Sequence, residues 1–435
     1  MSLYFTQKER ILTKLIHLFT LFIAFLIANS ISLTAQNSSE AWLYGQVTTW
    51  DGDTYEGQLR WGKEEAFWTD MFNASKTENE NLTYLDNDIK NRIAESRNNR
   101  NGWSTGRSWG GWGSRNVNHN NGHNFIHQFS VQFGDIQQIK RKNSSKVYVK
   151  MRDGETIKLN GTNYNDVGSK MRVYDPEIGK IELDWSDVEI VDFKPTPKGF
   201  KSTIGEPLYG KVKSWTGDYE GYIIWDKDER VGSDKLDGET RDADMSIEFA
   251  NIVSIKQRGN SSEVTLKSGR TYRMGDSNDV DNGNRGVIVV MPGKGRVVID
   301  WDDFDEVVFT DKPTVELKSY NSFVKPERIY GTVTTEDGKT YTGKIVYDLD
   351  ETYSYEILDG QIKDTEFEIP FRAIKSIQPR GGDESLVTLK SGEKYELDDA
   401  QDVNEKNTGI LVFDKAEEND PIYIFWEDVK LVELK

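Results

Sequence analysis

Apolar and polar residues alternate along much of the chain, in short runs that are separated by turn residues. Residues 341–347 are an example, since they alternate with a period of two and follow the turn pair Asp337-Gly338. An Asp-Gly pair between alternating runs is a strong hairpin signal, because glycine accepts the positive φ of a tight turn. The pattern therefore predicts half-buried strands joined by hairpins.

The same order of strands and turns occurs three times. The span from Phe249 to Trp301 is as long as that from Phe133 to Trp185, and a third span, Phe371 to Trp426, is three residues longer. Each copy holds a turn glycine and an Asp-Val pair in corresponding places: Gly154, Gly269 and Gly392; Asp166-Val167, Asp279-Val280 and Asp402-Val403. Such self-similarity is typical of tandem architectures. We expect an all-β fold of three tandem small β-barrel or sandwich modules, at residues 37–194, 195–310 and 311–435.

Each copy also contains a shorter internal repeat. The apolar spacing of residues 301–307 matches that of residues 249–255, and residues 426–432 match residues 371–377 in the same way. Each module is therefore interpreted as two half-units of about 50 residues, which are too small to be stable alone.

A glycine stands in the second strand of each copy, at Gly57, Gly221 and Gly343. Glycine inside a strand indicates a sharp bend or the close approach of another backbone. The hairpin at residues 337–345, with its counterparts, resembles those of SH3-like and Sm-like small barrels, which implies a barrel fold. RNA-binding Sm-like proteins carry basic and aromatic loop residues, whereas these copies are acidic, so RNA binding is not carried over.

The first copy contains an insertion at about residues 66–127, because 48 more residues separate Trp61 from Phe133 than separate Trp225 from Phe249. Four apolar residues at helical spacing predict one short amphipathic helix over residues 82–97: Leu82, Leu85, Ile89 and Ile93. The remainder is rich in Asn, Gly and Trp and is expected to form a loop.

Two groups of residues in this insertion are candidate binding residues. Trp103, Trp109 and Trp112 offer large apolar faces for a sugar or a partner surface, or they cover the flank of their own module. His119, His123 and His127 have even spacing, which allows a divalent metal site. The alternative is that they are ordinary polar residues of a loop. No other cofactor is expected.

The N-terminus predicts export. A basic start is followed by an apolar run over residues 15–27 and a small polar stretch, which is typical of a signal peptide covering residues 1–36. The alternative, a membrane anchor, is disfavoured because the run is shorter than the ~20 residues of a spanning helix. No later segment has comparable hydrophobicity, so no transmembrane segment is expected after cleavage. The chain contains no cysteine, which favours a bacterial envelope protein, periplasmic or extracellular, over a disulfide-rich one.

The charge and the motifs of the chain argue against several classes of function. A net charge of −18 disfavours nucleic acid and anionic membranes as partners. No serine or cysteine stands in a nucleophile motif, and the acidic pairs recur in several turns, where they are interpreted as solvated. Residues 276–283 have the composition of a calcium loop but lack EF-hand spacing, and the repeated Asp-Val pairs are interpreted as turns or caps.

We therefore expect a non-enzymatic secreted or envelope protein that presents tandem β modules to a protein or a cell-envelope polysaccharide. The alternative is a carbohydrate-binding or carbohydrate-processing protein that uses the Trp-rich insertion.

Overall fold

The computed structural model describes residues 40–100, 128–161, 166–311, 313–414 and 420–435. The description below concerns the compact unit Ser39–Lys435. The predicted signal peptide lies outside the described residues. Within these ranges, no helix combines the length and the apolar character needed to cross a membrane.

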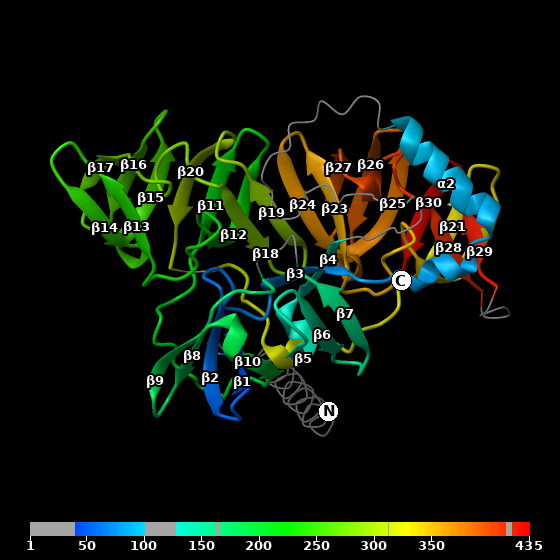
Figure 1. Ribbon diagram of the computed structural model, residues 1–435. Coiled ribbons are helices and arrows are strands. Elements are labelled where there is room, and N and C mark those ends of the chain that lie inside the picture. The colour runs from blue at the N-terminus through cyan, green and yellow to red at the C-terminus, as the bar shows by residue number, and fades with distance from the viewer. Residues whose placement is uncertain (1–39, 101–127, 162–165, 312, 415–419) are drawn as a thin grey trace, which may run out of the picture. The chain divides into compact units, whose positions relative to one another are not determined.

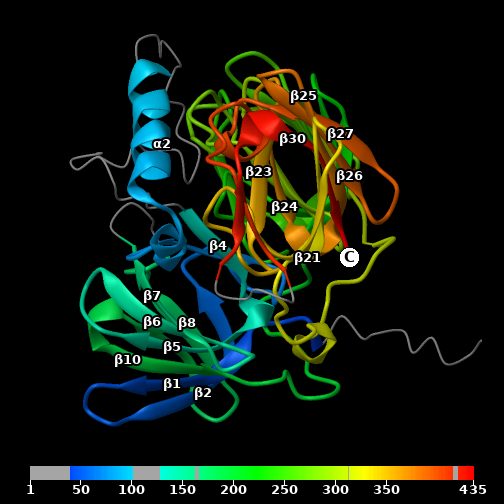
Figure 2. The ribbon, with the colours of Figure 1, turned by 90° about the vertical axis from the view of Figure 1, so that its right-hand side faces the viewer.

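The strands between residues 44 and 193, here called the first segment, form one antiparallel sheet of ten strands in the order β4-β3-β7-β6-β5-β10-β1-β2-β8-β9. Figure 2 shows β1, β2, β5–β8 and β10 grouped together. The strand bounds are β1 Tyr44–Thr49, β2 Thr54–Trp61, β3 Met71–Lys76, β4 Gln128–Gln132, β5 Ile136–Arg141, β6 Lys146–Met151, β7 Thr156–Asn160, β8 Met171–Asp175, β9 Gly179–Leu183 and β10 Val188–Phe193.

Residues 209–309, the second segment, contain β11 Tyr209–Ser214, β12 Asp218–Ile224, β13 Lys235–Glu239, β14 Asp244–Glu248, β15 Ile252–Gln257, β16 Ser262–Leu266, β17 Thr271–Met274, β18 Val287–Met291, β19 Gly295–Ile299 and β20 Phe304–Phe309. Residues 330–434, the third segment, contain β21 Tyr330–Thr335, β22 Thr340–Val346, β23 Ile357–Ile362, β24 Thr365–Pro370, β25 Ile374–Arg380, β26 Glu384–Leu389, β27 Lys394–Asp398, β28 Ile410–Phe413, β29 Ile422–Ile424 and β30 Val429–Leu434.

The pairing of strands follows one scheme in all three segments. The first strand pairs with the second and with the last, as β1 does with β2 and β10, β11 with β12 and β20, and β21 with β22 and β30. The all-β fold class is therefore confirmed. The division into three modules and six half-units stays a prediction, because β19 pairs with β24 and joins the second and third segments, apart from the separate β13–β14 pair, into one sheet of 18 strands (Figure 1).

The three strand glycines lie where two backbones come close together. A Cβ added to Gly57, Gly221 or Gly343 would lie 2.0–2.3 Å from a carbonyl oxygen of the strand that pairs with it, namely β8, β18 or β28. Any side chain would push these strands apart. The expected close approach of another backbone is thus present at each glycine.

Each segment has an aromatic core that is built around the last residue of the second strand or the residue after it. Trp61 contacts Phe133 and Trp185, with ring centroids 5.5 and 5.8 Å apart. Two other buried residues make the corresponding contacts: Trp225 with Phe249 and Trp301, and Tyr347 with Phe371 and Trp426. The aromatic residues that mark the sequence repeat are therefore core residues.

One α-helix of the described chain, α2 Asn87–Arg100, lies in the predicted insertion, after a 3₁₀ turn at Glu80–Tyr84. The helix starts later than predicted because the Asp86 carboxylate accepts a hydrogen bond from the Ile89 N–H and caps the helix. The four apolar residues of the prediction share one cluster with Leu349, Leu411 and Phe413 of the third segment. Figure 1 shows α2 beside strands of that segment. The insertion therefore covers part of another segment.

Buried ion pairs join the segments. Arg230 of the second segment contacts Asp70 of the first at 2.9 Å, and both side chains are fully buried. Two more pairs connect the first segment with its neighbours, Arg60 with Asp234 and Arg372 with Asp135, both at 2.7 Å. Buried pairs of this kind are costly to break, since one charge would remain without a partner. The segments are therefore expected to act as one body.

Candidate metal centre

The same turn follows the second strand of each segment. Trp61 and Glu65 exchange two backbone hydrogen bonds, and Trp225 with Glu229 and Tyr347 with Glu351 do the same. In the second and third segments, the two residues after the aromatic one adopt positive φ: Asp226 and Lys227, Asp348 and Leu349. The first segment has Gly62 at the first of these positions, with a φ of 61°. This geometry places a glutamate at the same point of all three segments.

The aspartates of the repeated Asp-Val pairs face this turn. Asp166, Asp279 and Asp402 each accept a backbone N–H bond through one carboxylate oxygen, from Asn73, Asp237 and Asp359 at 2.5–2.8 Å. Their main-chain oxygens accept a bond from the aromatic residue that starts the turn, at 2.6–2.9 Å. These bonds attach each Asp-Val loop to the interior of β3, β13 or β23, so the aspartates do not cap these strands.

Together the two elements assemble three carboxylates in each segment. The clusters are Glu64, Glu65 and Asp166; Asp226, Glu229 and Asp279; and Asp348, Glu351 and Asp402. They are here called the first, second and third clusters. Within each, one oxygen from every residue lies within 4.8 Å of the others.

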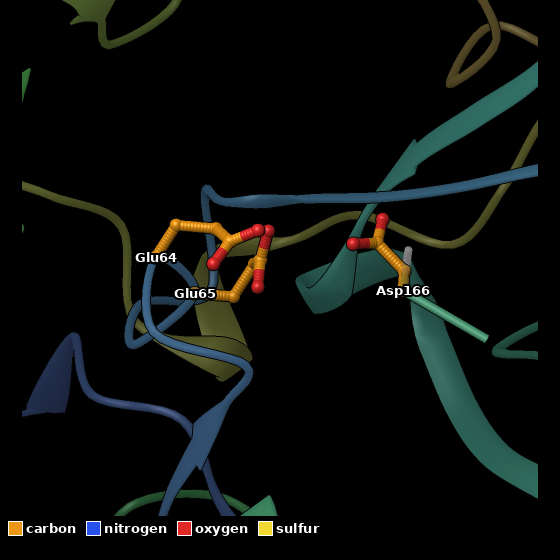
Figure 3. Close-up of side chains that lie close together, drawn as sticks. All are labelled: Glu64, Glu65 and Asp166. Carbon is orange, nitrogen blue, oxygen red and sulfur yellow. The ribbon is translucent and has the colours of Figure 1, made fainter. Parts of the chain in front are cut away.

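Several of these oxygens are buried without a hydrogen-bond partner. Glu65 Oε2 and Asp166 Oδ1 in the first cluster have none, although the two side chains are only 6% and 0% exposed. Figure 3 shows the carboxylates of Glu64, Glu65 and Asp166 turned toward one another. Glu351 Oε2 of the third cluster, 6% exposed, and Glu229 Oε2 of the second also lack partners. Unpaired buried carboxylate oxygens are costly, so each cluster is a candidate site for a bound proton or cation.

Burial and mutual repulsion raise the pKa of carboxyl groups in the clusters. Burial, followed by repulsion from Asp166, raises the pKa of Glu64 to about 8. Burial raises the pKa of Asp166 to about 7 and, together with repulsion from Asp279, that of Glu229 to about 9. In the third cluster, burial and neighbouring carboxylates hold the pKa of both Glu351 and Asp402 well above the usual range. These raised pKa values favour the binding of protons or of a cation at each cluster.

The donor set fits a hard divalent cation. All candidate ligands are oxygens, which Ca²⁺ and Mg²⁺ prefer. Ca²⁺–O distances of about 2.3–2.6 Å place two opposite ligands up to about 5 Å apart, whereas Mg²⁺ at about 2.1 Å requires a tighter octahedron. The oxygen separations of at most 4.8 Å are compatible with both ions, and the flexible coordination of Ca²⁺ places fewer demands on an irregular set of ligands.

The structure does not test the candidate binding residues from the sequence. Trp103, Trp109, Trp112, His119, His123 and His127 all lie outside the described residues, so both hypotheses stay predictions. The clusters are not predicted from the sequence, because acidic residues in turns are usually solvated. The available signal was a glutamate four residues after Trp61, Trp225 and Tyr347, in register with the Asp-Val repeat.

Comparison of the chain with protein-family models, curated proteins and solved structures finds no match.

Proposed function

We propose that this chain is a non-enzymatic exported protein whose repeated β segments bind divalent cations, Ca²⁺ above all, in buried carboxylate clusters. The observation that carries the proposal is the recurrence of three converging carboxylates with unpaired buried oxygens at the same turn. The bound ion connects the turn after the second strand with the Asp-Val loop. It thereby stabilises a β scaffold that binds a protein or a cell-envelope polysaccharide.

Repetition favours a structural role of the ion over a catalytic one. A metal that serves catalysis keeps an open coordination position for substrate, whereas a structural ion is enclosed by the fold. The described residues of the first and third clusters are buried, and an enzyme needs a single site rather than copies. Ion binding to the native state alone would stabilise the protein by mass action, about 2.7 kcal/mol at a concentration one hundred times the Kd.

Direct binding to chelator-treated protein tests this function. We expect Ca²⁺ to bind by isothermal titration calorimetry and to raise the midpoint of thermal unfolding. Glu65→Gln should lose the ion of the first cluster, because a carboxylate ligand becomes a neutral amide. Without Ca²⁺ the same variant should be more stable than the wild type, since one buried carboxylate has been removed from a repelling group.

A matched control is Glu177→Gln, which changes an exposed glutamate of the β8–β9 turn outside the clusters. It should bind Ca²⁺ like the wild type and show no reversal of stability. Wild-type protein that takes up no Ca²⁺, Mg²⁺ or Mn²⁺ at millimolar concentration would refute the proposed function.

A further inference from the structure

A positively charged side chain contacts a carboxylate of the second cluster directly. The Arg285 guanidinium donates to both carboxylate oxygens of Asp226, at 3.0 and 3.3 Å, and its Nη2 lies 2.6 Å from Asp228 Oδ2. The backbone N–H of Arg285 also donates to Asp226, at 2.6 Å. One residue thus supplies a full positive charge and three hydrogen bonds to a carboxylate of the cluster.

The corresponding positions in the other segments hold neutral residues. Arg285 stands two residues before β18, where the first segment has Ser169 before β8 and the third has Thr408 before β28. The Thr408 hydroxyl donates to Asp348 Oδ1 at 2.7 Å, so it holds the carboxylate that corresponds to Asp226 without adding charge.

Other cations near the clusters bind carboxylates outside them. Lys76 pairs with Asp350 and Glu356 beside the third cluster, and Arg296 pairs with Glu368 at 2.5 Å near the first. Their effect on the cluster carboxylates is through space, whereas Arg285 contacts Asp226 itself. A divalent ion in the second cluster would have to share that carboxylate with a guanidinium and would be repelled by it.

We propose that Arg285 acts as a built-in cation of the second cluster, so that the chain binds Ca²⁺ at the first and third clusters only. This inference rests on the proposed function, and it identifies the residue that decides which clusters take an ion. It also explains how one repeated turn serves two purposes. The cation is an exchangeable Ca²⁺ where a serine or threonine precedes the strand. It is a permanent guanidinium where an arginine stands at that position.

The stoichiometry of bound Ca²⁺ tests the inference. Equilibrium dialysis of the full chain against radioactive Ca²⁺ should give two ions per chain for the wild type. Arg285→Thr, which introduces the residue found in the third segment, should raise the number to three. Three ions in the wild type, or two in folded Arg285→Thr, would overturn the inference and leave the proposed function intact. A wild type that binds no Ca²⁺ would overturn the inference, and one that binds no Ca²⁺, Mg²⁺ or Mn²⁺ would overturn both.

A second pair of variants keeps the inference testable if Arg285→Thr does not fold. Glu229→Gln removes a carboxylate from the second cluster, and Glu351→Gln removes the corresponding one from the third. We expect two ions in Glu229→Gln but one in Glu351→Gln. Loss of an ion from both variants would show that the second cluster binds Ca²⁺ and would refute the role of Arg285.

Discussion

At the residue scale, Gly343 shows how closely the strands of a segment approach one another. A Cβ at this position would lie 2.0 Å from the main-chain oxygen of Phe413 in β28. We predict that Gly343→Ala lowers the free energy of unfolding by about 1–3 kcal/mol, because the pairing of β22 and β28 must open to admit a methyl group. Urea unfolding followed by tryptophan fluorescence measures this loss.

Gly275→Ala is the matched control for this substitution. Gly275 also lies in the sheet region, but an added Cβ there would find its nearest neighbour 3.6 Å away, an ordinary van der Waals distance. It should change the free energy of unfolding by less than about 0.5 kcal/mol. Equal losses in both variants would mean that strand propensity, and not the crossing backbone, explains the glycine at position 343.

At the scale of elements, α2 depends on its cap. The Asp86 carboxylate accepts the Ile89 N–H at 2.8 Å, at the start of a helix with few apolar residues. Asp86→Ala should therefore destabilise the first turn of α2 by about 1 kcal/mol, and Asp86→Ser should restore most of that loss. Hydrogen exchange of the amides of residues 87–93 gives a local measurement. Faster exchange across the whole chain, rather than in these residues alone, would contradict a local capping role.

The hairpins were predictable from the sequence because their signals are local. Asp-Gly turns such as Asp51-Gly52 and Asp337-Gly338 lie between β1 and β2 and between β21 and β22, as the alternation indicates. The apolar residues of the helix prediction also share one cluster, although the helix itself begins five residues later than residue 82. The boundary was missed because a cap side chain, not hydrophobic spacing, decides where the helix starts.

Which helices and strands pack against one another was less predictable than the helices and strands themselves. Packing of α2 on the third segment joins residues more than 250 positions apart, for example Ile93 and Leu349. The pairing of β19 with β24 likewise connects two repeats that the sequence presents as separate modules. Such contacts depend on the complementarity of whole surfaces, and no local pattern in the sequence encodes it.

At the scale of the whole molecule, the carboxylate clusters can be recognised only in the folded structure. Asp166 is about 100 residues distant from Glu65, and the insertion lies between them. Each carboxylate alone was compatible with a solvated turn. Only the pairing of the second strand with β8, β18 or β28 brings the two halves of a cluster together and removes them from water.

This arrangement makes stability depend on pH in a direction that is unusual for carboxylates. The pKa of Asp166 is raised from 3.8 to about 7 by burial, and that of Glu64 from 4.5 to about 8. The ion-free native state then binds more protons than the unfolded state, so the free energy of unfolding falls as pH rises from about 4 to about 8. A single group such as Asp166 should account for about 2 kcal/mol between about pH 5.5 and about pH 8. Urea unfolding in the presence of a chelator measures this slope.

Calcium should reverse that slope, because the ion binds the deprotonated carboxylates and competes with their protons. The stabilisation by Ca²⁺ is then expected to be larger at about pH 8 than at about pH 5.5, where protons already neutralise the clusters. Asp166→Asn separates this explanation from a general effect of net charge, since it should flatten the pH dependence of the ion-free protein and lose the response of the first cluster to Ca²⁺. An unchanged slope in Asp166→Asn would place the titrating groups elsewhere in the acidic chain. A gain of stability in the ion-free wild type from about pH 5.5 to about pH 8 would contradict this explanation. It would show that the clusters are ionised without a bound cation, despite the burial of Glu65 and Asp166.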